Sequence, residues 1–249
     1  MKMFFVSFIV AFMMAIVPLS ASAGDVRVGV VGVYSSSPYK GHDDTILPFP
    51  LFSYEGERFF FRGAGGGVHI WKGENQEVSV GVSYSGTHFD HKKTDDSRLK
   101  RLDDRYSTVT ADAYYTVHTE NWGQGGIKAS QDILGNSEGF TVDVWYKHPL
   151  FFDSLTVSPG AGMQWDSDKQ ADYYYGVSSR EARKSGLKKY DADHSVSPYL
   201  SLEVNYAITE SWSLVGGGKV TFLGSDIQDS PMVDDSQTYD ASFGVMYSF

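Results

Sequence analysis

The chain has 249 residues, a formal net charge of −10 and no cysteine. An acidic chain with scattered lysine and arginine is a poor candidate for binding nucleic acid, because phosphate groups demand a basic surface. The absence of cysteine excludes a fold held together by disulfide bonds, so strand pairing and burial must supply the stability.

Residues 1–23 have the features of a cleaved secretory signal peptide. A single charge, Lys2, precedes an apolar run from Phe4 to Val17, and the small residues Ala21-Ser22-Ala23 follow. The run is shorter than the roughly 20 residues that a membrane-spanning helix needs, which argues against an uncleaved anchor. We therefore predict an exported protein whose mature domain is residues 24–249.

Apolar residues alternate with polar ones along much of the mature chain. The clearest rows of alternate residues run from Val78 to Tyr84, Val109 to Val117, Phe140 to Tyr146, Leu155 to Trp165, Val196 to Ile208 and Trp212 to Phe222. A period of two places each row on one face of a β-strand. None of the rows contains a charge, as expected of a lipid-facing surface, where a lysine or arginine at mid-bilayer depth costs ~2–4 kcal/mol.

The lengths of these rows favour membrane strands, which need about 9–11 residues, over soluble strands, which average about 5–6. The chain ends on one more row, which includes Tyr239, Phe243, Tyr247 and Phe249. An aromatic terminal strand is typical of outer-membrane barrels, and we interpret these four residues as the assembly signal. The predicted fold is therefore all-β, an antiparallel transmembrane β-barrel, which can cross a membrane because closure pairs every backbone N–H and C=O. A secreted β-sandwich is the structural alternative.

We count about twelve strands, with about ten as the alternative. The predicted strands begin near Asp25, Thr45, Glu57, Glu77, Tyr106, Gly125, Gly139, Ser154, Ala171, Ser195, Ser211 and Thr238. An even number places both termini in the periplasm. Counting back from the C-terminus then predicts short periplasmic turns at 135–138, 166–170 and 207–211, and long outer loops at 178–194 and 224–237.

The segment His88–Arg105 does not fit this pattern, because it is long and highly charged and yet the parity makes it periplasmic. Either a strand is missed near Gly63–Gly67, or the protein carries an unusual periplasmic loop. Within the segment, His88 and His91 have a spacing found in some metal sites. They lie in a charged loop rather than on a helix, so we interpret them as solvated and expect no metal.

Charges of both signs are expected on the inner face of the barrel. They are Asp112, Lys128, Asp132, Asp143, Lys147, Glu203 and Lys219. A selective pore more often concentrates one sign, so we interpret these residues as ion pairs in a filled or narrow lumen. No motif of a nucleophile, general base or cofactor site stands out, so we expect a protein that is not an enzyme and has no cofactor.

One block near the mature N-terminus carries a family resemblance. It contains Tyr39, Gly41 and Asp43, then Pro48 and Pro50, and then Arg58 directly before three phenylalanines. Together with the exported start, the length and the terminal phenylalanine, this block resembles the MipA/OmpV family of outer-membrane proteins. The resemblance spans essentially the whole mature chain.

The resemblance implies a non-enzymatic protein of the outer membrane of a Gram-negative bacterium, surrounded by lipid and lipopolysaccharide. The name-giving member of the family is a scaffold that brings a lytic transglycosylase and a bifunctional penicillin-binding protein together in murein (peptidoglycan) growth. We therefore expect such a scaffold, with Lys92, Lys93, Lys100 and Arg101 as a candidate periplasmic partner contact. A narrow solute channel, or a surface adhesin acting through the outer loops, are the alternatives.

Overall fold

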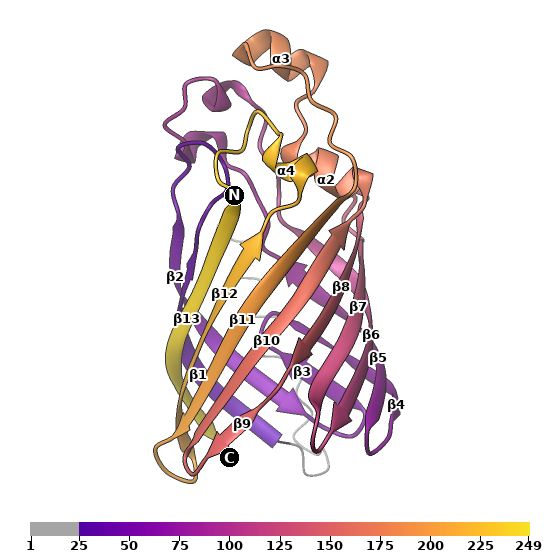
Figure 1. The fold of residues 1–249 in the computed structure, drawn as a ribbon, viewed down its shortest axis with the longest axis vertical. Coiled ribbons are helices and arrows are strands. Elements are labelled where there is room, and N and C mark those ends of the chain that lie inside the picture. The colour runs from indigo at the N-terminus through magenta and orange to yellow at the C-terminus, as the bar shows by residue number, and fades with distance from the viewer. Residues whose placement is uncertain (1–24) are drawn as a thin grey trace.

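The strands of the computed structural model form one closed antiparallel barrel (Figure 1). The structure describes residues 25–249, so the predicted signal peptide lies outside the described residues. The strands are β1 (Asp25–Ser35), β2 (Thr45–Glu55), β3 (Phe59–Arg62), β4 (Gly65–Lys72), β5 (Gln76–Ser85), β6 (Thr108–Thr119), β7 (Gly123–Asp132), β8 (Phe140–Lys147), β9 (Leu150–Phe152), β10 (Leu155–Asp166), β11 (Ser195–Ala207), β12 (Trp212–Phe222) and β13 (Gln237–Ser248). Pairing of β13 with β1 closes the barrel.

In the described chain, twelve strands form the barrel wall, as predicted. The thirteen labels reduce to twelve strands because β8 and β9 are two pieces of one strand. Both pieces pair with β10, and only His148 and Pro149 interrupt them. Within residues 25–249, no helix is long and apolar enough to cross a membrane.

One predicted strand is absent and one observed strand was not predicted, so the two errors cancel in the count. The strand β4 was missed because it begins with Gly65-Gly66-Gly67, where no side chains are present to alternate. The strand predicted from Ala171 is instead the helix α2 (Asp168–Tyr175), which the Ser167 hydroxyl caps by accepting a hydrogen bond from the Gln170 N–H. Serine at this position is a strong helix-start signal.

Because one strand was missed, every connection between β4 and α2 was predicted at the wrong end of the barrel. Short connections at 56–58, 73–75, 120–122, 153–154 and 208–211 gather at the end that carries the C-terminus, which we call the short-turn end. The long connections at 36–44, 86–107, 167–194 and 223–236 gather at the opposite end, the loop end. The predicted periplasmic turns at 135–138 and 166–170 also lie at the loop end, so their placement was wrong.

The predicted alternation holds along the barrel wall. Leu200, Val82 and Phe243 point outward and are 54%, 49% and 66% exposed in the isolated chain, as lipid-facing side chains are. The terminal strand follows the same pattern, and the rings of Tyr247 and Phe249 are 4.9 Å apart. The role of these residues as an assembly signal stays a prediction.

Candidate functional site

The buried apolar core of the described chain lies in the loops rather than inside the barrel. It consists of Tyr39, Phe89, Leu99, Leu102, Val177, Leu187, Leu223, Ile227, Met232 and Val233. These residues come from all four long connections, so the connections fold together into one unit, which we call the cap. The cap also contains the short helices η1 (His91–Lys93), η2 (Leu99–Arg101), α3 (Ser179–Ser185) and α4 (Ser225–Gln228), which Figure 1 shows with α2 at the loop end.

Tyr39 lies at the centre of the cap. Its ring contacts Phe89 edge-on with centroids 4.9 Å apart, and its hydroxyl donates to the Tyr174 carbonyl oxygen at 3.3 Å. The backbone of Tyr39 forms a β-bridge with Val233. Burial raises the pKa of Tyr39 well above its ordinary value, so the hydroxyl stays protonated and remains a donor.

A buried ion pair joins two of the loops. The Arg105 guanidinium lies 2.9 Å from the Glu181 carboxylate, and both side chains are more than nine-tenths buried. Arg105 also donates to the carbonyl oxygens of Asp103 and Gly176, and Glu181 accepts from the Ser178 hydroxyl and the Asp103 N–H. Because both charged groups make further hydrogen bonds besides the ion pair, the pair holds segment 86–107 against segment 167–194.

Burial tends to raise the pKa of Glu181, but the Arg105 charge and the hydrogen bonds from Ser178 outweigh burial and leave the pKa below its ordinary value. A lowered folded-state pKa stabilises the cap fully above the unfolded value of about 4.3, and this stabilisation is lost as the pH falls below it. We therefore expect the protection factors of the cap amides, taken against the intrinsic exchange rate at each pH, to fall below about pH 4, and to fall less in Glu181→Gln. Asp96, whose hydrogen bonds with Arg98 lower its pKa to about 2, stays ionised there. An acid response of equal size in Glu181→Gln would contradict the assignment.

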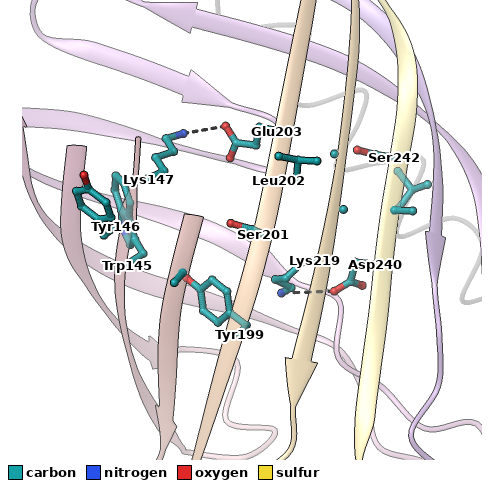
Figure 2. A pocket seen from close by; sticks show the side chains of 15 residues that line it. Trp145, Tyr146, Lys147, Tyr199, Ser201, Leu202, Glu203, Lys219, Asp240 and Ser242 are labelled. Carbon is teal, nitrogen blue, oxygen red and sulfur yellow. Dashed lines mark hydrogen bonds and ion pairs between the residues drawn. The ribbon is translucent and has the colours of Figure 1, made fainter. Parts of the chain in front are cut away.

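A cavity of 610 Å³ lies beneath the cap, inside the upper barrel. Tyr39, Tyr175 and Ile227 from the cap contribute to its lining, as do Tyr199, Lys219 and Asp240 from the barrel wall. The inner wall carries ion pairs, one of them between residues that line this cavity. Figure 2 shows Lys219 with Asp240, 3.4 Å apart, and Lys147 with Glu203, 2.9 Å apart.

The prediction that the inward charges pair with each other is confirmed for Lys128 with Asp112, 3.4 Å apart, and for Lys147 with Glu203. Lys219 instead pairs with Asp240, which the prediction did not include. Asp143 instead accepts a hydrogen bond from the Tyr199 hydroxyl at 3.2 Å. Asp132 lies at the loop end and accepts from three backbone N–H groups, those of Leu134, Ser137 and Glu138.

Near the short-turn end, Glu55, His69 and Glu77 are close enough together to suggest a metal site. Arg62 lies 3.0 Å from Glu55 and 3.5 Å from Glu77, and Lys72 lies 3.1 Å from Glu55. Because Arg62 and Lys72 already pair with the two carboxylates, we interpret this cluster as an ion-pair network. The His88 and His91 rings of the cap face different partners, the Gly86 carbonyl oxygen and Asp104.

The six residues of the sequence block do not form one site. Tyr39, Gly41 and Asp43 belong to the cap, where Gly41 has a positive φ of 56° and the Asp43 N–H donates to the Lys93 carbonyl oxygen. Pro48 and Pro50 lie on β2. Arg58 is exposed in the turn after β2, at the short-turn end.

The candidate partner contact predicted from sequence lies at the wrong end for a periplasmic role. Lys92, Lys93, Lys100 and Arg101 are exposed on η1 and η2 in the cap. The Arg101 guanidinium donates to the Lys184 carbonyl oxygen at 3.2 Å, which ties it to the neighbouring loop. Segment 88–105 therefore lies opposite the short turns, which face the periplasm in outer-membrane barrels, and the parity error at β4 is the reason why it was predicted on the periplasmic side.

Sequence reasoning missed an exposed apolar rim at the short-turn end. Within the described chain β9 pairs only with β10, so its other edge is free. Phe151 pairs with Thr156, which belongs to the inner face, and yet Phe151 is 77% exposed. Trp122, in the turn before β7, is 76% exposed, and its carbonyl oxygen accepts from the Tyr146 hydroxyl. We call the surface of Trp122 and β9 the rim patch; three apolar residues directly after Pro149 were its only sequence signal.

Comparison with known proteins gives consistent matches over the barrel. The family model described as MltA-interacting protein MipA matches residues 28–249. The MltA-interacting protein of Escherichia coli (strain K12) is 39% identical over 222 residues, which are 89% of this chain and 88% of that protein. The putative outer membrane protein YiaT of the same strain is 34% identical, covering 92% and 93% of the two chains.

More distant similarities extend to other outer-membrane proteins. Outer membrane protein OmpV of Vibrio cholerae is 27% identical, over 88% of this chain and 85% of that protein. Among solved structures, the translocator domain of autotransporter NalP from Neisseria meningitidis has a TM-score of 0.44 and 10% identity, and 98% of each chain is covered.

Proposed function

The chain belongs to the MltA-interacting protein MipA family of outer-membrane β-barrels, and from this premise we propose that it is a non-enzymatic protein that binds a lytic transglycosylase in the periplasm. The observation that carries the proposal is 39% identity, over nearly nine-tenths of both chains, to a protein named for its interaction with MltA. The family resemblance extends the proposal to a scaffold that also gathers a bifunctional penicillin-binding protein.

The rim patch is the surface we assign to this partner. In outer-membrane barrels the short turns face the periplasm, so the short-turn end is the end that a periplasmic enzyme reaches. Phe151 points to the inner side of the rim rather than to lipid, so its exposure is not explained by the membrane. A free strand edge beside exposed aromatic side chains suits a partner that adds a strand or inserts a side chain.

The cap favours a periplasmic binding protein over the two alternatives, a solute channel and a surface adhesin. A permanently open channel does not need a mouth covered by a packed apolar core, and the described inner charges are mostly paired. An adhesin would use 178–194 and 224–237, but Leu187, Ile227 and Met232 of these segments are buried in the cap. Conductance and cell binding therefore rank behind periplasmic capture.

We expect the variant Phe151→Ser to capture much less lytic transglycosylase than the unaltered protein. Exposed aromatic side chains at the centre of an interface contribute about 2 kcal/mol or more, which corresponds to more than a tenfold loss of affinity. The measurement is affinity capture from crosslinked cell envelopes with quantitative mass spectrometry, which reads the lytic transglycosylase and the penicillin-binding protein together.

The matched control is Leu134→Ser, because Leu134 is 57% exposed at the loop end. It should capture as much transglycosylase as the unaltered protein. Equal loss in both variants, or no loss in Phe151→Ser, would contradict the assignment of the rim patch. Failure of the unaltered protein to enrich any transglycosylase over an unrelated barrel would contradict the proposed function itself.

A further inference from the structure

The barrel wall has a gap beside β2 on the loop-end side. The hairpin partner β3 pairs with β2 only over Ser53–Glu55, and the last hydrogen bond between them runs from the Gly63 N–H to the Phe52 carbonyl oxygen. Above this point, Thr45–Leu51 of β2 pairs with β1 on one side and with no described strand on the other. The strand therefore has a free edge inside an otherwise closed wall.

The gap is framed on its other sides. Across from β2 lies the end of β5, where the Tyr84 N–H donates to the Ala64 carbonyl oxygen at the tip of the β3–β4 hairpin. At the top, the cap closes the frame, because the Asp43 N–H donates to Lys93 and the Asp95 N–H donates to Gly41. We call this framed gap the window.

Two prolines make the free edge compatible with a membrane. Along an antiparallel strand, the backbone N–H and C=O groups of successive residues point alternately to the two edges. The Phe52 carbonyl oxygen points toward β3, so the backbone nitrogens of Pro48 and Pro50 point to the same edge, toward the window. Proline has no N–H, so two donors that hydrocarbon would leave unsatisfied are absent. The carbonyl oxygens of these residues remain as acceptors. The edge is thus suited to hydrocarbon or to a molecule that brings its own donors.

The cavity under the cap extends to the window. The lining of that cavity includes Thr45 and Leu47 on one side of the window and Tyr84 and His88 on the other. On the outer side, Ile46 is 79% exposed beside the window. A molecule in the surrounding bilayer therefore reaches the cavity without crossing the cap.

The lining of the cavity is amphipathic. Val33, Leu47, Leu223 and Ile227 supply apolar surface, and Tyr199 with the Lys219–Asp240 pair supplies polar surface. Asp43 and Asp166 also line the cavity, so its polar surface disfavours an anionic head group. Beside the window, the Nε2 atom of His42 is buried and has no hydrogen-bond partner among the described residues. The volume of 610 Å³ falls within the roughly 300–1,000 Å³ of small-molecule sites.

We propose that this cavity binds a single-chain amphiphile from the surrounding membrane, with an uncharged or zwitterionic head, and that the ligand enters sideways through the window. The hydrocarbon chain lies along Val33 and Leu47, and the polar head reaches His42 and the wall near Tyr199. This binding occupies the loop-end half of the barrel, so it is independent of partner binding at the rim patch.

The test uses the full mature protein in phosphatidylethanolamine vesicles with a photoactivatable lysophosphatidylcholine, and the crosslinks are mapped by mass spectrometry. We expect crosslinks to cap residues above the cavity, in the peptides that contain Tyr175 and Ile227. Leu47→Trp places a bulky ring in the window and should reduce these crosslinks at least about tenfold, the scale of a lost apolar anchor.

Leu51→Trp is the matched control, because Leu51 lies on the same face of β2 at the short-turn end of the free edge and does not line the cavity. Its crosslinks should equal those of the unaltered protein. Crosslinks of the unaltered protein confined to lipid-facing residues such as Val30 and Phe243 would overturn the proposal, whatever the variants do. Equal crosslinking of the cap in both variants would overturn entry through the window.

Discussion

Replacing Arg105 with alanine should open the cap while the barrel stays folded. The substitution leaves the buried Glu181 carboxylate without its cation, and removal of one partner of a buried ion pair costs about 3–5 kcal/mol. Because every 1.4 kcal/mol is a factor of about ten, amide exchange in segments 86–107 and 167–194 should quicken by more than about a hundredfold. Hydrogen exchange with mass spectrometry measures this directly.

The matched control for this variant is Arg180→Ala. Arg180 also forms an ion pair, with Asp103, but its side chain is 67% exposed, and exposed pairs contribute only about 0–1 kcal/mol. Its cap should exchange at nearly the normal rate. Replacing both members of the buried pair, as Arg105→Met with Glu181→Leu, should recover much of the protection. Normal exchange in Arg105→Ala would show that the loops do not depend on this pair.

The second large effect is expected from a charge on the lipid face. Leu200 points outward from the middle of β11, so Leu200→Arg places a guanidinium in the bilayer and should lower the free energy of unfolding by ~2–4 kcal/mol. Ser201→Arg is the control, because Ser201 faces the lumen beside Lys147 and Glu203. Denaturant titration of the reconstituted protein gives both values. Equal destabilisation by the two substitutions would contradict the assigned faces.

The barrel could be predicted from the sequence because its signal is local. Alternation along β6, β10, β11 and β13 reports directly which side chains face lipid, and each strand carries the signal alone. At β4 the signal fails, since Gly65-Gly66-Gly67 has no side chains to alternate. One missed strand inverts the sides of the following connections, which is why segment 88–105 was placed in the periplasm.

The cap could not be predicted because its contacts are non-local. Tyr39 meets Phe89 and Val233, which lie far apart in the sequence, and no periodicity marks such partners. The sequence block that carries the family resemblance singled out Tyr39, Gly41, Pro48 and Pro50 without indicating their roles. The structure divides them between the cap and the free edge of β2.

The rim patch could not be predicted either, because it depends on strand pairing that the sequence does not show. Leu150, Phe151 and Phe152 look like a continuation of the strand before them, and apolar residues at strand ends are ordinary in membrane barrels. Only the pairing shows that β9 has a free edge and that Phe151 belongs to the inner side. The exposure of Phe151 indicates a binding surface only once the pairing shows that its side chain does not face lipid.

The proposed binding of a lytic transglycosylase at the rim patch is tested most directly by a photo-crosslinking amino acid placed at Phe151 in living cells. The same amino acid at Leu134, on the outer side, serves as the reference. We expect light to join the Phe151 position, and not the Leu134 position, to a lytic transglycosylase. Adducts at Phe151 that contain only lipid, lipopolysaccharide or assembly machinery would contradict the account.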